Sequence, residues 1–206
     1  MTYFIVINNL KIDKEIHQTI NSIIENNFTQ IDYNIDLNIE NKNKKLDDLI
    51  NFITENKIKI GVIAIKNLMI RKIISQYISN FIVDFNFLKI VHPSSIIGRK
   101  TRIGIGSIIM ANTIINTYST IKDFCIIESN TTIDHDSTIN NYSNIGTGVT
   151  TGGNFKLGSQ SVIGIGVCII ENINIGKCCH VEKGSLVTKD IGPNTKVEGI
   201  PAKKIS

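Results

Sequence analysis

The sequence predicts a small α/β unit with a parallel sheet, followed by an all-β solenoid of parallel strands. From Val91 to Val187 an aliphatic residue recurs at every sixth position, and Thr151 is the single exception among seventeen such positions. Before Val91 this period is absent, and apolar strand-like runs alternate with amphipathic helical runs, which is typical of βαβ units. A fixed period indicates a repeat architecture, in which each unit buries its apolar face by stacking on its neighbours.

The first part of the chain is expected to alternate strands and helices. The strands are predicted over 3–8, 31–37, 58–65 and 85–90, and the helices over 13–25, 46–55 and 67–80. Asp13 is a suitable N-cap for the first helix. The polar run over 41–45 is expected to be a solvated loop.

A six-residue unit has room for a short strand and a turn. The aliphatic residue is expected to point inward together with a small residue four positions later, a series that runs Ser95, Thr101, Ser107, Thr113, Ser119, Cys125, Thr131, Ser137 and Ser143. Three units close a triangular coil, and successive coils stack by parallel pairing at about 4.8 Å. The domain boundaries predicted in this way are 1–90 for the α/β unit, 91–192 for the solenoid, and 193–206 for a tail over the last coil.

Composition excludes several classes of protein. The net charge of +4 is mild, and the basic residues are scattered with little aromatic interleaving, so no nucleic-acid partner is expected. No run approaches the length of a membrane span and no signal-peptide pattern is present, so no membrane insertion and a cytoplasmic location are expected. The four cysteines lack zinc-site spacing, which predicts a reduced protein and no metal.

Four features together resemble a known family. The βαβ unit, the stretch 90–93, the uninterrupted repeats and the Val-x-Gly-x-Pro-Ala-Lys tail over 197–203 resemble bacterial sugar O-acyltransferases and nucleotide-sugar N-acetyltransferases. These enzymes act in surface-glycan and lipopolysaccharide pathways, and some acetylate sialic acid. The resemblance implies a left-handed β-helix, acetyl-CoA as co-substrate, a homotrimer, and a sugar substrate bound with the help of the N-terminal unit.

The run Ile133-Asp134-His135-Asp136-Ser137 matches the motif of this family that contains the general base. The resemblance implies that His135 is the base and that Asp136 orients it. A histidine titrates near neutrality, so it can accept the proton of an attacking amine or hydroxyl. A carboxylate on the other ring nitrogen holds the required tautomer. Asp134 also flanks the ring, and the sequence leaves open which aspartate does this.

The resemblance also implies residues that bind CoA. Gly153 and Asn154 follow the single break in the aliphatic series, where relatives donate a backbone N–H to the thioester carbonyl. Pro201, Ala202 and Lys203 lie in the tail segment that relatives pack near the CoA nucleotide.

Three asparagines are candidates for substrate binding. Asn8 and Asn9 occupy the turn after the first strand, where relatives have a glycine-rich turn for nucleotide phosphates. Asn144 stands where some relatives carry a second histidine. The function expected is acetyl transfer to a nucleotide-linked amino sugar. A sugar hydroxyl acceptor and a non-catalytic β-helix scaffold are the alternatives.

Overall fold

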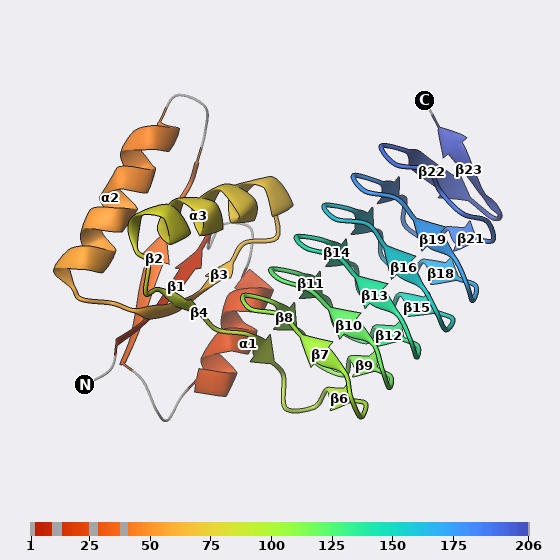
Figure 1. Ribbon diagram of the computed structural model, residues 1–206, viewed down its shortest axis with the longest axis horizontal. Coiled ribbons are helices and arrows are strands. Elements are labelled where there is room, and N and C mark those ends of the chain that lie inside the picture. The colour runs from red at the N-terminus through yellow and green to blue at the C-terminus, as the bar shows by residue number, and fades with distance from the viewer. Residues whose placement is uncertain (1–2, 10–13, 25–28, 38–40, 206) are drawn as a thin grey trace. The chain divides into compact units, whose positions relative to one another are not determined.

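The computed structural model describes residues 3–9, 14–24, 29–37 and 41–205, which form two compact units over 1–88 and 89–206 (Figure 1). The first unit contains a four-stranded parallel sheet in the order β2-β1-β3-β4. Its strands are β1 (Tyr3–Asn8), β2 (Thr29–Asn34), β3 (Ile60–Ala64) and β4 (Asn86–Phe87). The inner strands β1 and β3 are almost wholly buried, as expected for strands covered on both faces.

Three helices connect these strands: α1 (Lys14–Ile24), α2 (Lys42–Glu55) and α3 (Leu68–Phe81). The connection from β1 to β2 runs in the opposite direction from the next two connections, so right-handed crossovers place α1 on one face of the sheet and α2 and α3 on the other (Figure 1). Asn67 caps α3, because its side-chain oxygen accepts hydrogen bonds from the N–H groups of Met69 and Ile70 at 3.0 and 3.1 Å.

Several predicted boundaries in this unit differ from those of the structure. The run 41–45 is not a loop, because α2 begins at Lys42 and the N–H of Lys45 donates to the carbonyl of Asn41 at 3.0 Å. A charged run can form a solvated first turn as readily as a loop. The second strand begins and ends earlier than predicted, at Thr29–Asn34. The predicted helix ends at Asp13 and Glu25 lie outside the described residues.

The predicted strand over 85–90 is two separate strands. The first, β4, pairs with β3 in the α/β unit, whereas β5 (Ile90–Val91) pairs with β8 in the solenoid. An apolar run cannot show this division, because its two halves differ only in their partners.

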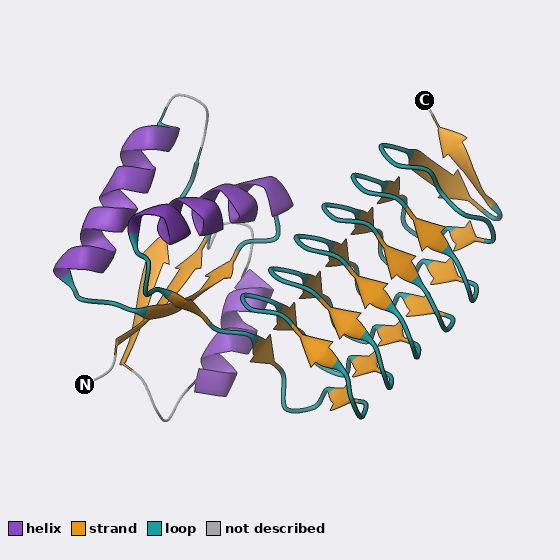
Figure 2. Cartoon of the chain, viewed as in Figure 1, coloured by secondary structure: helices purple, strands orange, loops and turns teal. Residues whose placement is uncertain are grey.

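The solenoid is a stack of two-residue strands at six-residue intervals (Figure 2). They are β5, β6 (Ile96–Ile97), β7 (Arg102–Ile103), β8 (Ile108–Ile109), β9 (Ile114–Ile115), β10 (Thr120–Ile121), β11 (Ile126–Ile127), β12 (Thr132–Ile133), β13 (Thr138–Ile139), β14 (Asn144–Ile145), β15 (Thr150–Thr151), β16 (Lys156–Leu157), β17 (Val162–Ile163), β18 (Cys168–Ile169), β19 (Asn174–Ile175), β20 (His180–Val181) and β21 (Leu186–Val187).

Parallel pairing between residues eighteen apart, such as Ile127 with Ile145, arranges these strands in three sheets. The sheets run β23 (Ala202–Ile205)-β22 (Lys196–Gly199)-β20-β17-β14-β11-β8-β5, β21-β18-β15-β12-β9-β6 and β19-β16-β13-β10-β7. The predicted aliphatic column fills the interior and is buried from Ile109 to Val187. Its second member, Ile97, is 36% exposed, because the first coil has no preceding coil to cover it.

The residues of the small-residue series do more than fit the narrow interior of the coil, because their hydroxyl groups form hydrogen bonds. Hydroxyl groups in this series donate to the carbonyl fifteen residues later, as Ser119 does to Asp134 at 3.0 Å. They also accept the N–H eighteen residues later, as Ser119 does from Ser137 at 3.1 Å. Each hydroxyl therefore joins one coil to the next and satisfies backbone groups that are buried at the corner.

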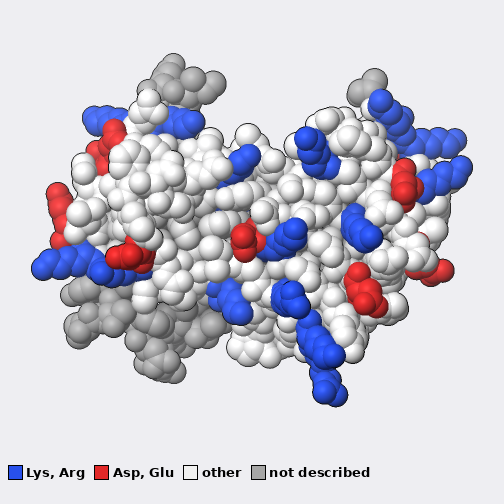
Figure 3. Space-filling model, in the orientation of Figure 1, with Lys and Arg blue, Asp and Glu red and all other residues white. Residues whose placement is uncertain are grey.

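Every sixth residue from Lys100 to Gly184 has a positive φ, between 55° and 68°, so all of these turns share one shape. Glycine occupies only four of these positions. Charged side chains are dispersed over the face of the molecule seen in Figure 3. Within the described ranges, no helix is long and apolar enough to cross a membrane.

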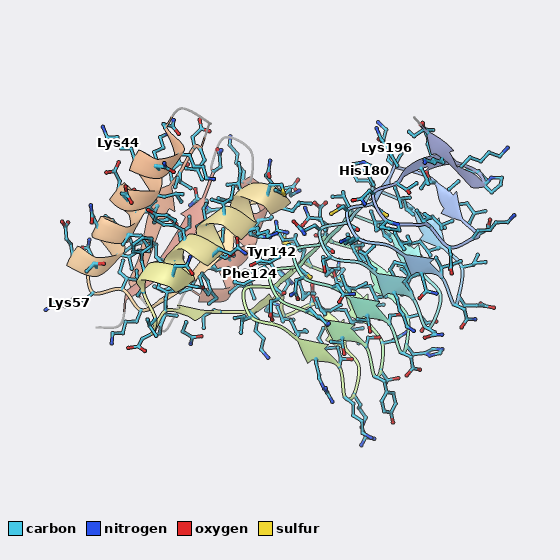
Figure 4. The ribbon with its side chains drawn as sticks, turned by 45° about the horizontal axis from the view of Figure 1, so that its top comes forward. Lys44, Lys57, Phe124, Tyr142, His180 and Lys196 are labelled. Carbon is cyan, nitrogen blue, oxygen red and sulfur yellow. The ribbon has the colours of Figure 1, made fainter. Side chains whose placement is uncertain are left out.

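The tail forms a hairpin of β22 (Lys196–Gly199) and β23 (Ala202–Ile205). Strand β22 adds to β20 in parallel, which places Lys196 beside His180 (Figure 4). Both side chains contact Glu182, at 2.7 Å from Lys196 and 3.5 Å from His180. The tail therefore extends one face of the solenoid by two strands.

Candidate functional site

His135 lies in the turn between β12 and β13, and 56% of its side chain is exposed. Its neighbours Ile133 and Ser137 point inward and are buried, so the third position of this repeat points outward, as predicted. A rigid coil on either side holds the turn. The ring is therefore presented to solvent from a fixed backbone.

The structure decides between the two aspartates. The Nδ1 atom of His135 lies 2.8 Å from Oδ2 of Asp136. Asp134 instead accepts hydrogen bonds through Oδ1 from the Asn116 side chain and from the His135 N–H, both at 2.8 Å. With Asp136 accepting from Nδ1, the Nε2 atom of His135 is the basic nitrogen.

Both aspartates act on the protonation of the site. The hydrogen bond with Asp136, followed by the charge of Asp134, raises the pKa of His135 above its ordinary value of 6.5. The hydrogen bonds from Asn116 and from the His135 N–H lower the pKa of Asp134. Asp134 is therefore ionised at neutral pH and stabilises a positive charge on the ring.

Gly153 lies one coil after His135 and directly against its ring. A Cβ atom at Gly153 would lie 2.7 Å from both Cε1 and Nε2 of His135. The two turns are joined by the Asn154 N–H, which donates to the His135 carbonyl at 2.8 Å. Among the described residues the N–H of Gly153 makes no backbone hydrogen bond, so this group can donate to a ligand.

The contacts of Thr151 give a reason for the single break in the aliphatic column. It is 3% exposed in the inward position of β15, and its hydroxyl accepts the N–H of Asp134 at 3.2 Å. An aliphatic residue would leave that N–H without this partner. The break therefore supports the turn that holds His135.

A pocket of about 280 Å³ opens at this place, lined by Asp134, His135, Gly152, Gly153, Asn154, Glu171 and Asn172. Glu171 and Asn172 are absent from the sequence-based predictions, as is Asn116. Glu171 and Asn172 lie one coil beyond Gly153 and Asn154, and the Asn154 side chain donates to the Asn172 side chain at 3.0 Å. Asn116 lies one coil before Asp134. The eighteen-residue period was the signal that could have found all three.

The other predicted residues lie elsewhere. Asn144 is half-buried on β14, on a different sheet from β12. The C-terminal hairpin contains Pro201, Ala202 and Lys203, of which Pro201 and Lys203 are exposed.

Asn8 and Asn9 lie at the carboxyl end of β1 in the α/β unit and are 0% and 8% exposed. The Asn8 amide donates to the Val6 carbonyl at 3.3 Å, while its buried Oδ1 has no partner among the described residues. The structure thus brings together His135, Asp136, Gly153 and Asn154 on adjacent coils of the solenoid.

No protein-family model and no curated protein matches the chain. Solved structures of sugar acetyltransferases do share its architecture. Over 100% of this chain and 98% of its own, GDP-perosamine N-acetyltransferase from Caulobacter crescentus aligns with a TM-score of 0.86 at 20% identity; that structure is a histidine-to-alanine mutant with CoA and GDP-perosamine.

Two further structures agree. The acetyltransferase domain of PglB from Neisseria gonorrhoeae, solved with acetyl coenzyme A, has a TM-score of 0.83 at 21% identity over all of both chains. WeeI from Acinetobacter baumannii has a TM-score of 0.81 at 22% identity over 99% of this chain and 100% of its own. At these identities the likeness establishes the fold, and the predicted fold class is confirmed.

Proposed function

We propose that the chain is an acetyl-CoA-dependent N-acetyltransferase whose acceptor is a nucleotide-linked amino sugar. The observation that supports this most directly is that the His135 ring lies against Gly153 in one open pocket. Asp136 binds the Nδ1 atom of the same ring. A base and a backbone donor on adjacent coils are the two groups that acyl transfer to an amine requires. The similar enzymes solved with CoA, acetyl coenzyme A and GDP-perosamine agree with the substrates proposed.

The residues have distinct roles in the proposed reaction. The free amine attacks the thioester carbonyl carbon, and Nε2 of His135 accepts the amine proton as the C–N bond forms. The N–H of Gly153 donates to the oxygen that becomes negative in the tetrahedral intermediate. The C–S bond then breaks, and the His135 imidazolium returns a proton to the departing thiolate. The products are the N-acetyl sugar and CoA.

Further parts of the proposal concern the other residues that contact the two substrates. Asn154, Pro201, Ala202 and Lys203 are proposed to contact CoA, and exposure of Lys203 suits a phosphate contact. The sugar nucleotide is proposed to bind Asn8, Asn9 and Asn144, with residues 1–90 acting as the substrate domain and 193–206 as the CoA-binding tail. The resemblance to surface-glycan enzymes supports a homotrimer in the cytoplasm.

The test is a thiol-release assay with acetyl-CoA against a panel of nucleotide-linked amino sugars, free amino sugars and hydroxyl sugars. His135→Asn should lower kcat/KM by about 10²–10⁴-fold, the range for removal of a general base. His180→Asn, which changes an exposed histidine on β20, is the matched control and should keep wild-type activity.

Turnover of hydroxyl acceptors without any amine acceptor would replace the proposal with sugar O-acetylation. Equal activity of the His135 variant and the wild type would exclude His135 as the base. A wild-type protein that releases no thiol with any acceptor would favour a non-catalytic scaffold.

A further inference from the structure

The pocket of about 280 Å³ that contains His135 also has Glu171 in its wall. The turns between β12 and β13, between β15 and β16, and between β18 and β19 follow one another along the solenoid (Figure 1). Two hydrogen bonds join them: the N–H of Asn154 donates to the carbonyl of His135 at 2.8 Å, and the N–H of Asn172 donates to the carbonyl of Gly153 at 2.9 Å. Glu171 is therefore one coil from Gly153 and two coils from His135.

The side chain of Glu171 starts from a fixed point. A Cβ atom at Gly152 would lie 2.5 Å from the backbone nitrogen of Glu171 and 3.0 Å from its Cβ, so the two turns are in close contact. Glu171 is exposed, and in the part of the chain that the structure describes its carboxylate forms no hydrogen bond and no ion pair. Its oxygens can therefore accept hydrogen bonds from a ligand beside Gly153.

Asn172 adds hydrogen-bond donors to the same wall of the pocket. Its Oδ1 atom accepts from the Asn154 side chain at 3.0 Å, which leaves its two amide hydrogens as donors. The carboxylate of Glu171 can only accept. An acceptor and a donor on consecutive residues are complementary to a secondary amide, because the N–H of such an amide donates and its carbonyl accepts.

Acetyl-CoA contains an amide of this kind close to its thioester. Four covalent bonds separate the thioester carbonyl carbon from the first amide nitrogen of the pantetheine arm, which is about 5 Å in an extended chain. Consecutive coils of the solenoid are about 4.8 Å apart. When the thioester oxygen accepts from the N–H of Gly153 and the arm runs toward the C-terminal tail, this amide therefore reaches the coil that contains Glu171.

We propose that Glu171 and Asn172 bind the pantetheine amide nearest the thioester and thereby select the acyl donor. This inference rests on the proposed function, because that function places the thioester oxygen at the N–H of Gly153. The carboxylate of Glu171 accepts the amide N–H, and the Asn172 side chain donates to the amide carbonyl. The amine of the acceptor is not the partner of Glu171, because it reacts at His135, two coils away.

Glu171→Ala tests the proposal with three acyl donors of different length. The kcat/KM for acetyl-CoA and for S-acetyl-N-acetylcysteamine, which keeps the first amide and no more of the arm, should fall about tenfold or more, because loss of a hydrogen bond to a charged group weakens binding by about that factor. The kcat/KM for ethyl thioacetate, which has no amide, should stay at the wild-type value. Glu171→Gln keeps an acceptor oxygen and should lose less. Glu55→Ala removes an exposed glutamate at the end of α2 and is the control, which should match the wild type with every donor.

Calorimetric titration of the full chain with CoA measures the same contact without catalysis. Glu171→Ala should bind CoA about tenfold more weakly than the wild type. Unchanged affinity for CoA overturns the inference, and so does an equal loss of kcat/KM with ethyl thioacetate. A raised KM for the acceptor beside an unchanged KM for acetyl-CoA would assign Glu171 to the acceptor and overturn it as well. A protein that binds CoA and transfers no acetyl group would contradict the proposed function, while the calorimetry would still decide the role of Glu171.

Discussion

Replacement of Gly153 by alanine should separate catalysis from stability in this protein. The added Cβ would lie 2.7 Å from Nε2 of His135, against about 3.4 Å for an ordinary contact, a shortfall of about 0.7 Å. The ring is 56% exposed, so it can turn away without disturbing the core. This movement should break the alignment of Nε2, because the backbone of both turns is held by the hydrogen bond from Asn154 to His135.

A displacement of this size at a reacting group should lower kcat/KM by about 10- to 100-fold, since a misplacement of roughly 1 Å can reduce a rate about 10²-fold. The free energy of unfolding should change by less than about 1 kcal/mol, because the atoms that must move belong to an exposed side chain. The assay is thiol release at saturating and limiting acceptor, with thermal unfolding of the same preparation.

Gly192→Ala is the matched control, because a Cβ at Gly192 would meet nothing within 4 Å. It should leave both the activity and the stability as they are. Wild-type kcat/KM in the Gly153 variant would refute the reasoning, since it would mean that the ring does not need its position over Gly153.

Three further variants test other contacts of the site. Gly152→Ala should unfold about 1–3 kcal/mol more easily in denaturant titrations, because its Cβ would lie 2.5 Å from the backbone nitrogen of Glu171, and unaltered stability would contradict the close stacking of these turns. Asp136→Asn removes the main cause of the raised His135 pKa; the neutral base is lost as pH falls through that pKa, so the acid limb of the kcat/KM profile should move to lower pH, and a limb that stays in place would argue against this pair. Thr151→Val should change the free energy of unfolding by less than about 1 kcal/mol, because the added apolar burial offsets the lost hydrogen bond to the Asp134 N–H. It should still lower kcat/KM severalfold, because the turn that holds His135 loosens. A large loss of unfolding free energy together with the loss of activity would indicate a purely structural role for Thr151.

The fold was predictable from the sequence because the solenoid is governed by nearest neighbours. Each aliphatic residue from Ile109 to Val187 needs only the coil before and after it, so the period alone specified its burial. The α/β unit was less predictable. The first turn of α2 at Lys42 is charged and carries no apolar periodicity, so it resembles a loop. The division of 85–90 into β4 and β5 depends on the strands with which the two halves pair.

The site was partly predictable for the same reason. That His135 points outward follows from its place in the repeat. The choice of Asp136 over Asp134 does not, because it depends on Asn116, eighteen residues earlier, whose amide holds Asp134 in another direction. Glu171 and Asn172 become neighbours of the site only when the coils stack.

By itself the sequence determined the repeat, its inward column and the outward position of His135, since local geometry repeated at a fixed interval leaves little choice of structure. Only the tertiary structure decided which carboxylate bonds the ring, why Thr151 interrupts the column, and that Gly153 lies against Nε2 of His135. These are contacts between coils. They depend on distances of a few ångströms across the stack, which a linear pattern of residue types does not contain.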